Sequence, residues 1–96
     1  MGPKTDYKIL LQKGAQIVDV RTNAEYQSGH IKGSVNIPLQ LLQHNMSKIN
    51  KDKPVITCCA SGMRSASAKN ILRAGGYQEV YNGGGWMALQ NEIGSR

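Results

Sequence analysis

Short apolar runs alternate along the chain with segments whose apolar residues recur at helical spacing. Four runs have the apolar, largely β-branched composition of buried strands, and turn residues bound them. These runs are residues 15–20, 34–38, 55–58 and 79–81. Helical spacing and terminal glycines predict helices at residues 5–13, 22–29, 39–45, 65–73 and 86–89. The glycines at 83–85 are expected to form a flexible turn.

Two of the predicted helices begin at residues that can cap them. Thr5 or Asp6 can accept hydrogen bonds from the first backbone N–H groups of the helix that follows. Thr22 with Glu25 three residues later forms a capping box, and Gly29 is expected to end that helix. The strand before it therefore leads directly into a short helix.

Strands that alternate with short helices within 96 residues predict an α/β fold, in which a small, mainly parallel sheet carries helices on both faces. Ligands of such sheets bind at the carboxyl ends of the strands. Cys59 follows one predicted strand, and Asp19 and Arg21 lie at the end of another. We therefore expect these three side chains at the same edge of the sheet.

The length of the chain predicts a single domain with one modest core. Its net charge of +6 results from lysines that are scattered rather than gathered into one basic stretch. The chain has no Phe, one Trp and no RNA-binding aromatic signature. The composition thus argues against a nucleic-acid partner and favours a small anionic substrate.

The two cysteines are adjacent, so they cannot form a disulfide framework, and no Cys or His pair has the spacing of a structural zinc site. This cysteine usage predicts a protein of reducing compartments, without a bound metal. No stretch reaches 18 apolar residues, which argues against a membrane span. We expect a cytoplasmic location.

Cys59 lies where an apolar strand gives way to a helix. The free N–H groups and the dipole of a helix N-terminus favour an anion at that place. The thiolate is the nucleophilic form of cysteine, and its pKa falls near a helix N-terminus or a cation, which Arg64 can supply. Ala60, Ser61 and Gly62 are small enough for the backbone to curl around an anion. The alternative is a buried structural cysteine, because free cysteine is among the most buried residue types.

Two long segments carry a resemblance to a known family. IVDVRTNAEYQSGHIKGSVNIPL (residues 17–39) and VITCCASGMRSASAKNILRAGGYQEVYNGGGWMAL (55–89) combine a D-V-R turn, a G-H-I-x-G-S-x-N-I-P segment, a C-x-x-G-x-R loop and a late glycine pair. In this order and spacing, the chain resembles a single-domain rhodanese-like sulfurtransferase. The resemblance implies a three-layer α/β/α domain over residues 1–96, with its core at about 5–92.

The resemblance also assigns roles to individual residues. Cys59 is implied as the nucleophile that accepts sulfur, while Cys58 lies one position too early. The implied substrate-binding residues are Ala60, Ser61, Gly62, Met63 and Arg64. Asp19 and Arg21 are expected to support the pocket structurally and electrostatically. Glu25 and His30 are interpreted as structural residues that hold a helix and the turn after it together.

The implied reaction has two steps and needs no metal or organic cofactor. Cys59 takes a sulfane sulfur from an anionic donor such as thiosulfate and passes it to cyanide, a thiol or a partner protein. The sequence departs from some relatives in having Ala60 and Ser61 at positions of basic residues, which leaves the donor open. Leu89 stands where many relatives have Trp, and we interpret Leu89 and Trp86 as core residues.

Two other functions remain as alternatives. Related folds hold phosphate in a cysteine–arginine loop, as phosphatases and arsenate reductases do, but four residues separate Cys59 from Arg64, one fewer than in those phosphatases. A shorter loop favours a single sulfur atom over a tetrahedral oxyanion. The second alternative is a non-catalytic regulatory module or a persulfide carrier that depends on a partner protein.

Overall fold

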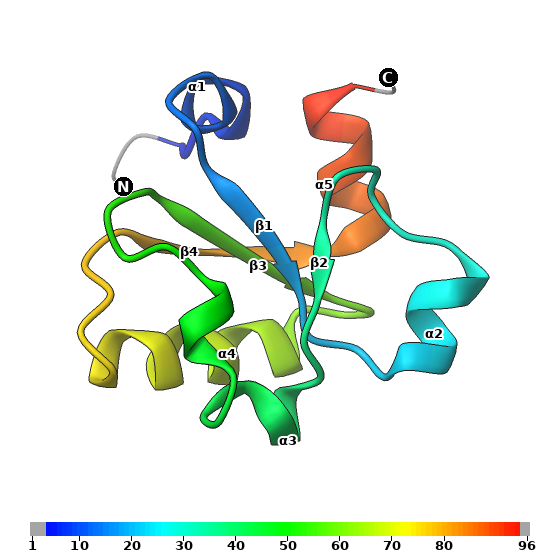
Figure 1. Ribbon diagram of the computed structural model, residues 1–96. Helices are drawn as coiled ribbons and strands as arrows, with labels where there is room; N and C mark the ends of the chain where they lie inside the picture. Colours follow the sequence, from blue (N-terminus) through cyan, green and yellow to red (C-terminus); the bar gives the residue numbers. More distant parts are fainter. Residues whose placement is uncertain (1–3, 95–96) are drawn as a thin grey trace.

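The computed structural model describes residues 4–94, and four parallel strands form its centre (Figure 1). The strands are β1 (Gln16–Asp19), β2 (Val35–Asn36), β3 (Val55–Cys59) and β4 (Val80–Gly85). Their order in the sheet is β2-β1-β3-β4, so β1 and β3 are central. Every residue of β3 is buried, as expected for a strand covered on both faces.

Helices cover both faces of this sheet. They are α1 (Tyr7–Gln12), α2 (Asn23–Ser28), α3 (Leu39–Leu42), α4 (Met63–Ala74) and α5 (Trp86–Ile93), and Met46–Lys48 forms a 3₁₀ turn. Figure 1 shows α1 and α5 on one side of the sheet and α3 and α4 on the other. The predicted α/β/α architecture with a small parallel sheet is confirmed.

The alternation of side chains along β1 and β3 divides the core into two hydrophobic clusters. On the side of α3 and α4, Val18, Val55 and Leu72 belong to one cluster. On the side of α1 and α5, Ile56 and Leu89 belong to the other. Burial of each large aliphatic side chain contributes about 1.5–3 kcal/mol, so both layers are held mainly by apolar contacts with the sheet.

The predicted caps are present at both helix starts. The side chain of Asp6 accepts hydrogen bonds from the backbone N–H groups of Lys8 and Ile9 at the start of α1. Thr22 and Glu25 form a reciprocal capping box at the start of α2. Because the box begins three residues after β1, it fixes the direction in which the chain leaves the sheet.

Glycines 83–85 do not form the flexible turn that the sequence suggested; they are the second half of β4. A Cβ atom on Gly83 would lie 2.8 Å from Cγ2 of Ile56 and 2.9 Å from Cδ2 of Leu89. Gly83 is therefore required because β4 lies too close to its neighbours there for a side chain, and Gly85 is similarly close to Ala60. Gly84 has open space around it, but its φ of +78° favours glycine.

Three predicted boundaries also differ. The predicted strand at 34–38 is reduced to the two residues of β2. Cys59 still belongs to β3, and α4 already begins at Met63, so the turn between them contains residues 60–62 alone. The closing helix α5 continues to Ile93. The cysteine is consequently held by a strand as well as by the turn.

Candidate active site

The thiol of Cys59 lies against the N-terminus of α4 and has no solvent-exposed surface. Its Sγ accepts hydrogen bonds from the backbone N–H groups of Gly62 at 3.0 Å and Ser65 at 3.3 Å. The hydroxyl of Ser65 lies 3.4 Å from the same atom. Cys59 also belongs to the apolar cluster beneath α4, but polar groups surround its sulfur. An inert structural cysteine does not require such donors.

The short turn at 60–62 depends on glycine in two places. Gly62 precedes α4 with φ of +104°, a left-handed conformation that glycine adopts without strain. A Cβ atom on Gly85 would lie 2.9 Å from the carbonyl oxygen of Ala60. The end of β4 thus allows the turn to lie directly against it, which brings the N–H groups of the turn to the sulfur.

The surroundings of Cys59 have opposing effects on its ionisation. Burial raises the pKa of the thiol, but hydrogen bonds from the Ser65 hydroxyl and from the backbone N–H groups of Ser65, Gly62 and Ser61 stabilise the thiolate. The hydrogen bonds outweigh burial, so the pKa of Cys59 lies below the ordinary value of a cysteine. The arrangement therefore favours the nucleophilic form.

Cys58 has the opposite environment. Strand alternation directs it to the other face of the sheet, into the cluster with Ile56 and Leu89. Burial, together with the negative charge of Asp19 nearby, raises the pKa of its thiol to about 12. Cys58 is consequently a protonated core residue at neutral pH.

Ser65 and Asn82 are site residues that the sequence interpretation missed. The Ser65 hydroxyl donates to Oδ1 of Asn82 at 2.6 Å, and that oxygen also accepts the backbone N–H of Gly84 at 2.9 Å. When Cys59 is a thiolate, the same hydroxyl can donate to Sγ, and Gly84 still satisfies Asn82. The available sequence signal was weak: Ser65 is one of several small residues in α4, on its buried side.

Arg64 extends toward α2 and forms a bidentate ion pair with Glu25. Its Nη1 and Nη2 lie 2.7 Å and 3.0 Å from the two carboxylate oxygens of Glu25. Both side chains are about one third exposed. The hydrogen bonds from Arg64, and those from Thr22, lower the pKa of Glu25 to about 2. Glu25 thus has a second role beyond capping, and Arg64 is shared between α2 and the cysteine turn.

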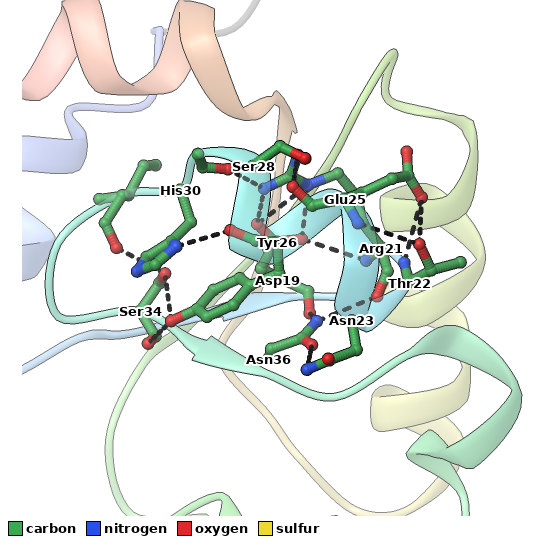
Figure 2. A network of polar contacts seen from close by, with 12 residues as sticks. Asp19, Arg21, Thr22, Asn23, Glu25, Tyr26, Ser28, His30, Ser34 and Asn36 are labelled. Atoms are coloured by element: carbon green, nitrogen blue, oxygen red, sulfur yellow. Dashed lines mark hydrogen bonds and ion pairs between the residues drawn. The ribbon is translucent and has the colours of Figure 1, made fainter.

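Asp19 and Arg21 form a buried ion pair beside the end of β1. Figure 2 shows Arg21 within a polar network that includes Asp19 and α2. Its Nη2 donates to Asp19 Oδ2 at 2.7 Å and to the Gly29 carbonyl oxygen at 2.7 Å. The guanidinium also lies over the Trp86 ring, 4.8 Å from its centre. Through these contacts, the guanidinium of Arg21 links β1, the end of α2 and α5.

Comparison with known sequences decides the family. Residues 4–92 match the model of the family described as the Rhodanese-like domain. The chain belongs to this family. The match covers both segments on which the resemblance rested, so that expectation is confirmed.

Several relatives of this rhodanese-like chain are similar over most of its length. The uncharacterized protein YqhL of Bacillus subtilis is 44% identical over 68 residues, which cover 71% of this chain and 54% of YqhL. This chain thus spans about half of that protein. Thiosulfate sulfurtransferase GlpE of Shewanella oneidensis is 34% identical over 80 residues, covering 83% of this chain and 79% of GlpE.

A solved structure described as rhodanese with anions from E. coli shares the fold. It has a TM-score of 0.73 and 32% identity, and the match covers 85% of this chain and 94% of that chain. Together with the family match, these likenesses confirm the predicted enzyme class, a rhodanese-type sulfurtransferase.

Two further properties concern the part of this rhodanese-like chain that the structure describes. Within residues 4–94, none of the helices has both the length and the apolar character needed to span a bilayer. Over the same residues, His, Cys, Asp and Glu side chains do not gather in threes where a metal ion could bind. His30, two residues after α2, contacts that helix: its ring stacks on Tyr26 with 3.7 Å between centres, and Nδ1 lies 2.7 Å from the Tyr26 carbonyl oxygen.

Proposed function

We propose that Cys59 carries a sulfur atom as a persulfide between an anionic donor such as thiosulfate and a thiophilic acceptor such as cyanide, a thiol or a partner protein. The observation that carries this proposal is the set of hydrogen bonds from Gly62 and Ser65 to Sγ of Cys59. They favour a thiolate at the end of β3, where ligands of parallel sheets bind. The names of relatives such as GlpE support the same chemistry.

The proposed cycle consists of two displacements at sulfur. The Cys59 thiolate attacks the outer sulfur of thiosulfate, a sulfur–sulfur bond forms, and sulfite leaves with the electron pair of the bond that breaks. The acceptor then attacks the terminal sulfur of the persulfide, and Cys59 leaves as a thiolate. With cyanide the product is thiocyanate. Atoms and charge balance in both steps without a proton donor or an oxidant.

Backbone N–H groups are proposed to stabilise negative charge throughout this cycle. The thiolate, the persulfide and the departing sulfite are all anions, and the N–H groups of Gly62 and Ser65 at the start of α4 are held in place before the reaction begins. Because Cys59 has no exposed surface, a donor reaches Sγ only after the surroundings open. Ala60 and Ser61 are exposed and belong to the short turn, so we propose that they move.

Arg64 is proposed to attract the donor, and its ion pair with Glu25 is proposed to loosen when the anion arrives. Its side chain is about one third exposed, and Arg64 lies on the first turn of α4, five residues after Cys59. An ion pair that is accessible to water is weak enough to reorganise when an anion arrives. Arg64 therefore draws the donor to the turn. Before the donor arrives, the ion pair with Glu25 holds the guanidinium of Arg64 in position.

One comparison of activities tests the reaction class. We expect the unmodified protein to transfer sulfur from thiosulfate to cyanide, and to hydrolyse an aryl phosphate at background rate. The turn of residues 60–62 holds one sulfur atom closely, and a misplacement of about 1 Å at a reacting atom can cost on the order of 100-fold. Clear phosphatase activity would overturn the proposed reaction. Inactivity in both assays, with the fold intact and Cys59 reduced, would favour a carrier loaded by a protein.

Ser65→Ala tests how the thiolate is stabilised. The substitution removes a hydroxyl that hydrogen-bonds the thiolate, so it should raise the pKa of Cys59. We expect kcat/KM for thiosulfate to fall about tenfold near neutral pH and to approach the unmodified value at alkaline pH, because a hydrogen bond to a charged group is worth about 1.5 kcal/mol or more. The measurement is the pH profile of kcat/KM.

Ser67→Ala is the matched control for that variant. Ser67 lies in the same helix but is exposed, so its pH profile should equal that of the unmodified protein. A loss in Ser65→Ala that is equal at every pH would indicate displaced geometry instead of a changed pKa. That result would contradict the role assigned to the hydroxyl.

A further inference from the structure

A groove of about 660 Å³ lies at the end of the sheet opposite to Cys59. Its walls come from α1, α5, β2, the residues at 31–33 and those at 48–49. The first three residues of β1 also line it, whereas Cys59 is the last residue of the parallel strand β3. The groove is therefore separate from the cysteine turn.

The groove exists because β2 is too short to cover its neighbour. The pairing of β2 with β1 begins at Val35 opposite Val18, so Gln16 and Ile17 have no β2 residue beside them. Figure 1 shows α1 and α5 together on one face of the sheet, where both contribute to the groove. The apolar residues that line the space are Leu11, Ala15, Ile17, Val18, Ile31, Val35, Ile49 and Ile93. Val35 is 43% exposed although it belongs to a strand.

Charge along the groove has one sign. Lys8, Lys32 and Lys48 line it, and all three are exposed. Within residues 4–94, no Asp or Glu is among the lining residues. Lysine side chains can lay their apolar stems along such a surface and keep the ammonium groups at its rim. An apolar floor with a cationic rim matches a ligand that has an apolar body and an anionic head.

We propose that this groove binds a small amphipathic carboxylate, with an unbranched apolar chain of medium length. Its volume lies within the range of about 300–1,000 Å³ that is usual for small-molecule sites. A second copy of this chain fits less well, because each copy carries a net charge of +6 and the lysines would face like charge. Binding at this place does not depend on the proposed sulfur chemistry.

Titration of the ¹⁵N-labelled 96-residue chain with decanoate tests the proposal, with amide chemical shifts as the measurement. We expect saturable changes in the amide chemical shifts of Ile17, Ile31 and Val35. The amide chemical shifts of Cys59 and Gly62 should not change. Acetate has the head without the chain, and 1-decanol has the chain without the charge, so both should bind more weakly than decanoate. Equal binding of acetate, or shifts centred on Cys59, would overturn the proposal.

Variants separate this site from general attraction to a basic protein. Lys32→Gln and Lys48→Gln should each weaken decanoate binding about two- to fivefold, the usual effect of one exposed ion pair. Lys69→Gln changes the charge equally but lies on α4, across the sheet, and should have no effect. Cys59→Ser should also bind decanoate normally, even if sulfur transfer fails. Equal weakening by Lys69→Gln, or a protein dimer that decanoate dissociates, would show that the proposal is wrong.

Discussion

Replacing Cys59 by serine is expected to abolish persulfide formation and sulfur transfer. A serine hydroxyl has no thiolate to offer, so the rate should fall to background, a loss of about 1,000-fold or more. The fold should survive, because the N–H groups of Gly62 and Ser65 can donate to a hydroxyl oxygen as they do to Sγ. Peptide mass spectrometry after incubation with thiosulfate should detect a gain of about 32 Da on Cys59 in the unmodified protein alone, the mass of one sulfur atom.

Cys58→Ala is the control for this result. Cys58 is fully buried against the cluster of α1 and α5, and its thiol is protonated at neutral pH because burial raises its pKa to about 12. The substitution should cost about 1 kcal/mol of stability and leave the sulfur on Cys59. Sulfur found on Cys58, or retained in Cys59→Ser, would disprove the assignment of the nucleophile.

The fold could be predicted because its main signals are local. Each central strand is a short apolar run, and the caps at Asp6 and Thr22 involve residues within three positions of one another. The parallel direction of the strands then follows from general rules for α/β proteins. The order β2-β1-β3-β4 was not predicted, because the same alternation of elements is compatible with other orders.

The contacts around the cysteine are not local, which explains what the sequence interpretation missed. Asn82 meets Ser65 across 17 positions, and the register of β3 and β4 shifts between Thr57 and Cys59. Arg64 reaches Glu25 across 39 positions. No pattern in a single sequence fixes such pairs. A run of glycines has the same limitation, because it is equally compatible with a flexible turn and with a strand that lies too close to its neighbours for side chains.

Replacing Arg21 by leucine is expected to be among the most destabilising single changes in this protein. Asp19 has no exposed surface and Arg21 is 4% exposed, so the change leaves a buried carboxylate without its partner. Removing one member of a buried ion pair costs about 3–5 kcal/mol, a large part of the stability of a small domain. Leucine also removes the guanidinium from above the Trp86 ring, so the loss reports on that contact together with the charge and the hydrogen bonds. Urea denaturation measures it as a lower transition midpoint.

Arg64→Leu makes the matched comparison, because it breaks the partly exposed pair with Glu25 by the same substitution. It should cost about 1 kcal/mol or less in stability. Its kcat/KM for thiosulfate should nevertheless fall about tenfold if Arg64 draws the donor to the turn, whereas Arg21→Leu should lose activity only as it loses folded protein.

Adding Asp19→Asn to Arg21→Leu should restore part of the stability, since the buried charge is then gone. The carbonyl groups of Glu25 and Gly29 still lack their donor, so recovery is incomplete. Equal destabilisation by Arg21→Leu and Arg64→Leu would contradict the distinction between the two pairs.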